Sequence, residues 1–295
     1  NIMSGMAIDA TTVQWLTSGY ALVEACIIPM NAYLVGRFST RKLFIGGISW
    51  FAIGSAIACF APSFPFLLMG RVFQAMATGI VMPMVFTLIL LLFPREKRGS
   101  AMGIIGLIIA FAPAVGPSLS GVLVDTVGWR MLFAIVTVLA VLVVLFSAIC
   151  LKNLTEFDRA PFDVPSVLLM FPGMLALLYG LSSFTKADNM ILSIALSVLG
   201  IVLLAFFVRR QLKLETPMLR VQVLKARRFC TTVILIALLQ AALVGSGVVM
   251  PIYVQQVLGG TATTSGLIML PGALLGAATG FISGRIFDRR GVRGL

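Results

Sequence analysis

Glu24 stands near the middle of the first long apolar run of the sequence, with no second carboxylate near it. If that run crosses a membrane, an ionisable side chain there is costly and marks a functional position by default. Helical spacing places Tyr20 and Asn31 on the same stripe as Glu24. We expect this stripe to face the interior of a helix bundle or a water-filled substrate cavity, where a carboxyl group could bind and release a proton. The alternative is a glutamate that is hydrogen-bonded for packing.

A cation lies inside the run at 66–93. Arg71 is followed on one helical face by Gln74 and Thr78, which predicts an interior polar stripe. An arginine does not deprotonate in practice, so Arg71 could bias a nearby carboxylate but not carry the proton itself. The alternative is that its long side chain reaches the outer membrane surface. Gln240, in a later run, is a further cavity candidate, and an interhelical hydrogen bond explains it equally well.

Composition excludes several classes of protein. Of the residues, 60% are hydrophobic and 11% charged, whereas soluble domains carry about 25% charged residues. The net charge of +12 is typical of basic cytoplasmic loops, so we expect no nucleic-acid partner. The sequence has no histidine, and we expect no enzymatic activity, metal or cofactor. We interpret the cysteines as packing residues rather than disulfides: Cys26, Cys59, Cys150 and Cys230.

The elements that must position these residues are apolar runs long enough to cross a bilayer, which takes roughly 20 residues. Backbone groups cannot stay unpaired in lipid, so these runs must be helices. We therefore predict an all-α transmembrane bundle with nine spans, at about 15–35, 43–61, 66–93, 99–123, 131–151, 164–184, 189–208, 230–257 and 265–284.

The charges of the connecting loops alternate along the chain. Nearly all of the 22 Lys and Arg fall in every second loop, and basic loops face the cytoplasm. This pattern places residue 1 outside and residue 295 inside. The longest loop, 209–228, alternates basic and apolar residues. A solvated connector and a helix on the inner membrane surface are equally good interpretations of it.

Two short segments that follow apolar runs look like copies of one another. Residues 284–293 read GRIFDRRGVR and residues 32–42 read AYLVGRFSTRK. Repeated halves are a feature of secondary transporters. Each copy could form a charged hinge between sliding helices or an ordinary basic loop, the interpretation we favour for 32–42 taken alone. The candidate positions are Arg37, Arg41, Lys42, Gly284, Asp288, Arg289, Gly291 and Arg293.

The second copy resembles the G-x-L-x-D-R-x-G-x-R signature loop of the major facilitator superfamily. The copy at 32–42 departs from that pattern, because Ala32, Gly36 and Ser39 stand where the family has Gly, Asp and Gly. The first copy therefore lacks the acidic residue that the second copy keeps.

Two further motifs support the resemblance. Residues 71–83 are similar to the family's R-x-x-Q-G…P helix, with Ala75 for the usual Gly, and this implies that Arg71 takes part in proton coupling. Residues 116–121 resemble the antiporter motif G-P-x-x-G-G, with Ser120 for one Gly. That motif implies a kinked helix that shapes and seals the cavity, whereas routine helix packing is the alternative. Its candidate positions are Gly116, Pro117 and Gly121.

The runs at 164–184 and 189–208 are similar to the extra pair of spans in the fourteen-span drug:proton antiporters. This likeness implies three parts: a first half lacking its first span, two extra spans with a cytoplasmic loop, and the start of a second half. The parts are residues 1–151, 152–228 and 229–295. We expect one further span before residue 15 and four after residue 295, so that the chain is an incomplete portion of a larger transporter.

The resemblance implies proton-coupled efflux of lipophilic drugs or toxic compounds across the cytoplasmic membrane of a bacterium, by alternating access. The implied partners are the lipid bilayer, small lipophilic substrates and protons, and an accessory export protein is a further candidate. Two alternatives stay open. One is a proton-coupled transporter of a specific lipid or metabolite, and the other is a fragment that does not transport.

The loop charges make a prediction about orientation. With the native cysteines removed, cysteines placed at Ser63 and Thr261 should react with a membrane-impermeant thiol reagent added to intact cells. Cysteines placed at Arg98 and Lys213 should not react, because the basic loops face inward. Equal labelling at all four positions would contradict this orientation.

Overall fold

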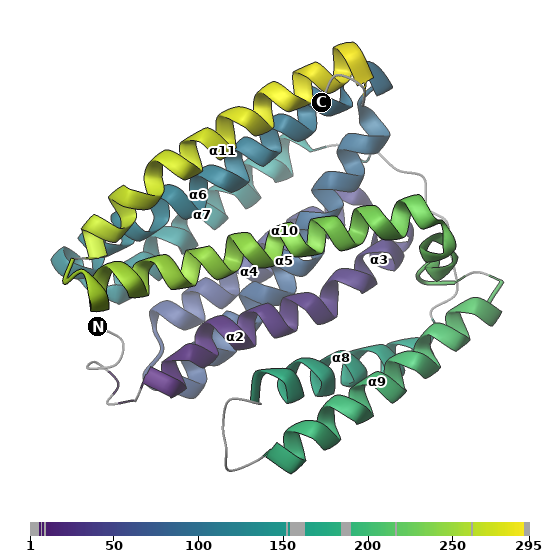
Figure 1. Ribbon diagram of the computed structural model, residues 1–295, viewed down its shortest axis with the longest axis horizontal. Coiled ribbons are helices and arrows are strands. Elements are labelled where there is room, and N and C mark those ends of the chain that lie inside the picture. The colour runs from purple at the N-terminus through teal and green to yellow at the C-terminus, as the bar shows by residue number, and fades with distance from the viewer. Residues whose placement is uncertain are drawn as a thin grey trace. The chain divides into compact units, whose positions relative to one another are not determined.

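Helices make up the fold of this protein in its computed structural model, which describes residues 6, 8, 10–151, 153, 163–183, 190–215, 217–260 and 262–291 (Figure 1). No β-strand occurs in these ranges, so the prediction of an all-α fold is confirmed. The longer helices are α2 (Ala10–Ile27), α3 (Asn31–Arg37), α4 (Thr40–Cys59), α5 (Phe64–Leu92), α6 (Arg98–Val127), α7 (Trp129–Cys150), α8 (Val164–Ser183), α9 (Met190–Lys213), α10 (Arg227–Ile252) and α11 (Ala262–Arg290).

Seven helices within the described ranges are long and apolar enough to cross a membrane. They correspond to seven of the runs found in the sequence: Thr40–Cys59, Phe64–Leu92, Trp129–Cys150, Val164–Ser183, Met190–Lys213, Arg227–Gly247 and Thr264–Arg289. The remaining two runs form α6 and the pair α2 and α3. A 3-10 turn at Ile28–Met30 separates α2 from α3. It contains Pro29, whose ring removes a backbone donor and disfavours an unbroken helix.

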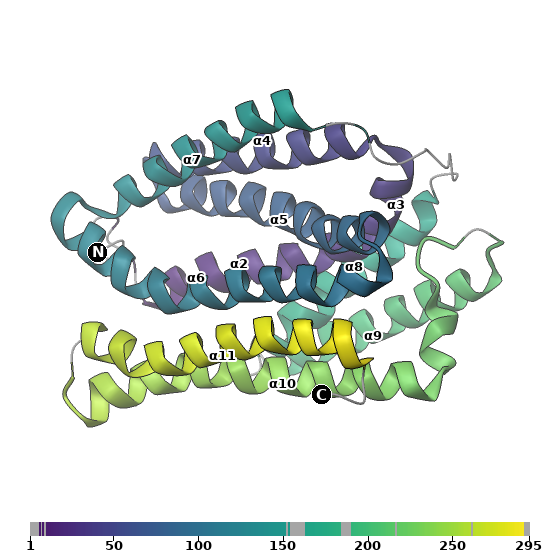
Figure 2. The same cartoon turned by 90° about the horizontal axis from the view of Figure 1, so that it is seen from above.

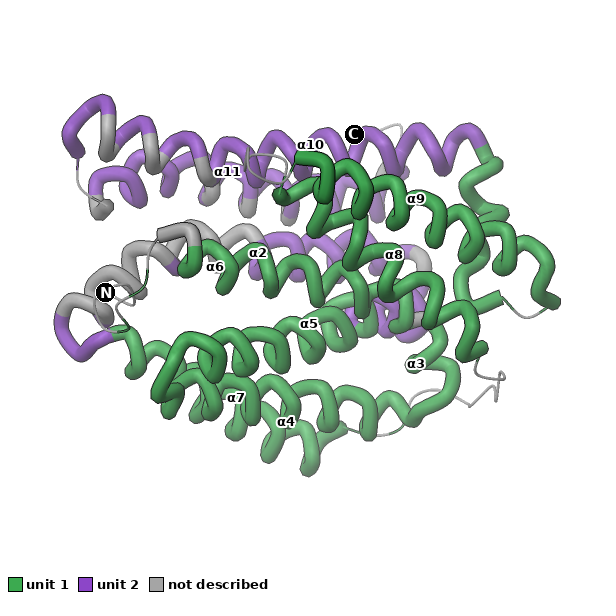
Figure 3. The backbone as a smooth tube through the Cα atoms, turned by 90° about the horizontal axis from the view of Figure 1, so that it is seen from below, with its two compact units in different colours: residues 1–84, 129–226 green, residues 85–128, 227–295 purple. Residues whose placement is uncertain are grey.

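The chain divides into two compact units, coloured separately in Figure 3. Unit 1 comprises residues 1–84 and 129–226, and unit 2 comprises residues 85–128 and 227–295. In unit 1, α4 packs along α7, α8 along α9, and α2 against α8. In unit 2, α6 and α11 lie side by side over most of their length (Figure 2). The three-part division expected from the sequence stays a prediction.

Small residues let the helices of unit 1 approach closely. A Cβ atom added to Gly54 of α4 would lie 2.7 Å from the carbonyl oxygen of Gly70 in α5. Likewise, a Cβ atom on Gly200 of α9 would lie 2.5 Å from the backbone nitrogen of Leu177 in α8. Lipid tails are as apolar as leucine, so helix association in membranes depends on such close packing and on interhelical hydrogen bonds.

Two expectations about loops are corrected. Residues 284–290 are not a hinge loop but the last turns of α11, and Gly291 follows with a φ of 65°. A glycine in this left-handed conformation is a common way to end a helix. The loop 209–228 is also shorter than expected. Helix α9 continues to Lys213, and a 3-10 helix spans Val221–Lys225 rather than a long surface helix.

The close contact of α8 with α9 predicts that Gly200→Ala destabilises the protein. The added methyl group meets backbone atoms that cannot move aside, and overpacking costs about 1–3 kcal/mol. The free energy of unfolding, measured by detergent-induced unfolding, should fall by that amount. Gly46→Ala is the matched control, because nothing lies within 4 Å of a Cβ atom at that helical position. Equal stability of the two variants would contradict this packing.

Candidate functional site

A connected polar cluster joins α2 to α5 inside unit 1. The hydroxyl groups of Tyr20 and Thr78 share a hydrogen bond of 2.6 Å. Thr78 also donates to the backbone carbonyl of Gln74, one turn earlier in α5, at 3.0 Å. A threonine hydroxyl commonly makes this bond to the preceding turn, which fixes its rotamer. The polar stripe expected on α5 therefore meets the stripe expected on α2.

Arg71 is turned inward in this cluster. Its Nη1 donates to Gln74 Oε1 at 2.8 Å, and its Nε donates to the carbonyl oxygen of Leu16 at 3.3 Å. The guanidinium carbon lies 4.4 Å from the centre of the Tyr20 ring, within the range of a cation–π interaction. These contacts favour the interior interpretation of Arg71 over extension to the membrane surface.

Ser55 of α4 completes the cluster. Gln74 Nε2 donates to Ser55 Oγ at 2.7 Å, and Ser55 in turn donates to the carbonyl of Phe51 at 2.9 Å. Ser55 is 0% exposed and Gln74 2% exposed. Because the amide nitrogen of Gln74 donates to Ser55, the side chain is oriented so that its amide oxygen accepts from Arg71.

Sequence reasoning missed Ser55. Isolated serines are common in apolar helices, and a single one carries little signal. The neighbouring Gly54 is the signal that was available, because at this glycine the backbone of α4 lies directly against that of α5.

Glu24 lies one turn after Tyr20 on α2 and is partly buried. Both Glu24 and Arg71 are close enough to act electrostatically on Tyr20. Within the described part of the chain, the Glu24 carboxyl group has neither a hydrogen-bond partner nor a salt-bridge partner. A carboxyl group without a partner among the described residues is a candidate for binding a proton or a ligand.

Asn31 and Gln240 have different surroundings from this cluster. Asn31 is buried and donates to the backbone carbonyl of Ile80. That contact ties α3 to α5, so Asn31 contributes to helix packing. Gln240 lies on α10 of unit 2, and its side chain is exposed. Of the expected substrate-cavity residues, the structure therefore brings together Tyr20, Gln74 and Thr78, and it adds Arg71, a proton-coupling candidate.

A second candidate site lies in unit 2, where the end of α11 meets the beginning of α6. Asp288 accepts hydrogen bonds from the backbone nitrogens of Gly99 and Ser100 at 2.7 and 2.6 Å, and from Ser100 Oγ at 2.5 Å. The first backbone N–H groups of a helix have no partner within the helix, and a negative charge is favoured there. Asp288 thus caps α6 from a different helix. The sequence pattern singled out Asp288 but could not show which helix it would bind.

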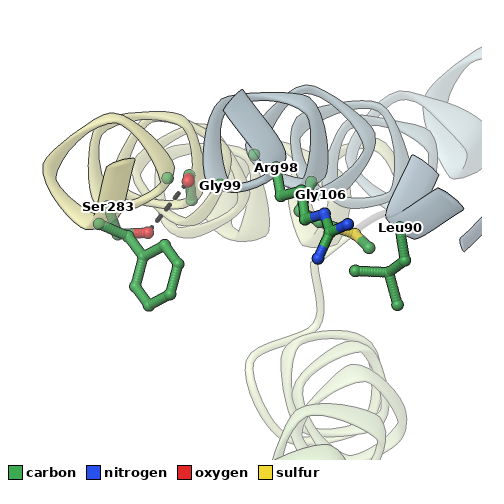
Figure 4. A pocket seen from close by; sticks show the side chains of 10 residues that line it. Leu90, Arg98, Gly99, Gly106 and Ser283 are labelled. Atoms are coloured by element: carbon green, nitrogen blue, oxygen red, sulfur yellow. Dashed lines mark hydrogen bonds between the residues drawn. The ribbon is translucent and has the colours of Figure 1, made fainter. Parts of the chain in front are cut away.

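Glycines make this contact possible and leave a hollow beside it. A Cβ atom on Gly284 would lie 2.3 Å from the carbonyl oxygen of Gly99. The hollow has a volume of about 630 Å³, and Figure 4 shows Leu90 and Arg98 on one side of it and Ser283 on the other. Half of its lining residues are glycines: Gly99, Gly103, Gly106, Gly280 and Gly284.

The remaining motif positions differ in their contacts. In the first copy of the signature segment, Arg41 donates to the carbonyl of Ala148 in α7 at 2.5 Å. Ser39 caps α4 by accepting from the backbone nitrogen of Lys42 at 3.1 Å, and Arg37 lies 6.0 Å from the centre of the Tyr33 ring. This copy fixes the beginning of α4 without an acidic cap.

Other expected positions are less informative. Gly116 is exposed in α6, with nothing within 4 Å of a Cβ atom placed on it. Pro117 and Gly121 also belong to α6, but their side-chain surroundings lie outside the described part of the structure, as does Arg293 entirely. Arg289 is exposed at the end of α11. No group of three or more His, Cys, Asp or Glu that could hold a metal ion occurs among the described residues.

Comparison with curated proteins gives close bacterial relatives. The chain is 42% identical to the uncharacterized MFS-type transporter YcnB of Bacillus subtilis over its whole length. It is 36% identical to the lincomycin resistance protein LmrB of the same species, again over its whole length. It is 30% identical, over 95% of its length, to the multidrug resistance protein B homolog of Mycobacterium tuberculosis. The chain spans 63%, 62% and 52% of these three relatives.

The family model of the Major Facilitator Superfamily matches residues 1–295. This match extends over the whole chain and agrees with the helical fold and the seven membrane-length helices described above. The chain therefore belongs to the major facilitator superfamily of membrane transporters.

Proposed function

We propose that the protein exports lipophilic compounds across the cytoplasmic membrane of a bacterium in exchange for protons, by alternating access. One observation carries the proposal: the carboxyl group of Glu24, which has no partner among the described residues, lies one turn from a polar cluster within otherwise apolar helices. The names of two relatives, a lincomycin resistance protein and a multidrug resistance protein homolog, support a drug as the exported compound.

In this proposal, the coupling of drug and proton fluxes depends on the fixed charge of Arg71 and on the variable charge of Glu24. Arg71 stays cationic because a guanidinium does not lose its proton in a protein. Glu24 has two states, so a proton and a cationic or hydrogen-bonding drug can compete for it. A ligand shifts an equilibrium only by its different affinities for two states. Drug binding to the ionised form and drug release from the protonated form then couple the two fluxes.

The cap on α6 provides a point at which conformational exchange can be controlled. While Asp288 holds the N–H groups of Gly99 and Ser100, α6 and α11 cannot slide past each other at this end. Sliding breaks these two hydrogen bonds together with the one from Ser100 Oγ and leaves the beginning of α6 uncapped. We infer that release of this cap accompanies the change in the side of the membrane to which the cavity opens.

Replacing Glu24 tests the coupling. Glu24→Gln keeps the size and hydrogen bonding of the protonated form, so it should abolish efflux driven by a pH gradient. Glu24→Asp keeps the charge with a shorter reach and should retain part of the activity. The measurement uses the full-length transporter in proteoliposomes with an imposed pH gradient and a fluorescent lipophilic substrate. Drug-coupled proton flux at the unaltered rate in the Gln variant would show that Glu24 is not the proton site.

Replacing Asp288 tests the cap. Asp288→Asn removes the negative charge, worth about 0.3–1 kcal/mol at a helix beginning, and one acceptor oxygen. Transport should slow while the amount of inserted protein and the substrate affinity stay close to those of the unaltered protein.

Ser100→Ala is the graded comparison for this test. It removes one hydroxyl donor and keeps both backbone donors to Asp288, so its effect on the transport rate should be smaller. A loss of substrate affinity at an unchanged rate in Asp288→Asn would contradict a role in conformational exchange.

A further inference from the structure

Several cations lie where α8 begins and α9 ends, and one of them, Arg210, is paired with a carboxylate. Arg210 donates to both carboxylate oxygens of Asp163, at 2.8 Å from Nε and 2.7 Å from Nη2. Ser166 donates to the same carboxylate. The hydrogen bond from Arg210 is the main reason that the pKa of Asp163 lies below its usual value, so this carboxylate stays ionised at neutral pH. Its negative charge is matched by Arg210 and is not available to the neighbouring cations.

Gln211 links α9 to α8 and to the segment that follows α9. Its side chain is 2% exposed, and its Nε2 donates to Ser166 Oγ at 2.6 Å. Its Oε1 accepts from the backbone nitrogen of Leu219 at 3.0 Å, which folds the following segment back toward the helix pair. A buried amide with both ends satisfied holds the helix ends and the segment after them in one arrangement.

A hollow of about 370 Å³ opens at this end of unit 1. Its lining combines an apolar surface with a cationic edge: Leu169, Phe206, Leu214, Arg209, Arg210 and Lys213. Phe206 is 53% exposed, so the apolar side of the hollow is open to the surroundings of the helix pair. Within a bilayer, those surroundings are lipid chains.

Arg209 and Lys213 provide positive charge at the hollow that no described acidic residue pairs with. They are four residues apart on α9 and so lie on one helical face, where like charges repel. Neither has an acidic partner in the part of the chain that the structure describes. Glu215, two residues beyond Lys213, is exposed and does not line the hollow. An anion placed between the two cations would relieve their repulsion.

We propose that this hollow binds an anionic phospholipid, with the phosphate of its headgroup held by Arg209 and Lys213 and the first part of an acyl chain lying on Phe206 and Leu169. Basic residues near the inner membrane surface attract anionic lipids, and the loop charges place this end of α9 on that side. Free phosphate would satisfy the cations but would leave the apolar side of the hollow unused.

The test measures binding of phosphatidylglycerol to the full-length protein in neutral detergent, by native mass spectrometry. Arg209→Gln combined with Lys213→Gln should weaken the affinity about 20- to 30-fold, since each cation near the membrane surface contributes roughly fivefold. The matched control is Arg220→Gln combined with Lys225→Gln, which removes the same charge from exposed positions outside the hollow. The control should change the affinity by less than about threefold.

Two further measurements distinguish a phospholipid headgroup from free inorganic phosphate as the bound anion. Inorganic phosphate at the same concentration should not displace the lipid, and Phe206→Ala should weaken phosphatidylglycerol binding with both cations in place. Equal losses in the two double variants would show diffuse attraction and overturn the proposal. So would displacement by inorganic phosphate, or binding of phosphatidylcholine as tight as that of phosphatidylglycerol. A thermal unfolding curve of each lipid-free variant shows that any loss is not a loss of folding.

Discussion

The positive charge of Arg71 is the constraint on which the packing of unit 1 depends. A guanidinium in an apolar span cannot shed its charge and must be surrounded by acceptors or by an aromatic face. The carbonyl of Leu16, the amide oxygen of Gln74 and the ring of Tyr20 supply that environment. Because these groups come from α2 and α5, holding the charge also holds the two helices in register.

Close approach of the helices makes this arrangement possible. Gly54 and Gly70 bring α4 onto α5, which lets the short side chain of Ser55 reach Gln74. Gly79 lies against Ile27 and the backbone of Glu24, which brings α2 to α5. Polar side chains as short as serine and threonine can bond across helices only where the backbones are this close.

Three acidic residues differ in the partners that the described residues give them. Asp288 is held by three hydrogen bonds at the beginning of α6, and Asp163 by a bidentate contact with Arg210. Both are bound to fixed partners near the beginning of a helix, Asp288 at α6 and Asp163 at α8. Glu24 has no such partner in the described residues, and an uncommitted carboxyl group is what proton exchange requires. The distinction lies in the partners and not in the residue type.

The sequence by itself determined the helical fold, the positions of the spans and the polar positions Glu24, Arg71 and Asp288, because lipid imposes apolar runs in which each polar residue stands out. Only the tertiary structure decided their partners. Ser55 lies 19 positions from its partner Gln74, and Asp288 lies up to 189 positions from its partners in α6. The helical state of residues 284–290 was also missed, since charged residues end a hydrophobic run without ending the helix. Helical periodicity fixes which residues share a face, whereas the choice of facing helix depends on close packing between distant segments.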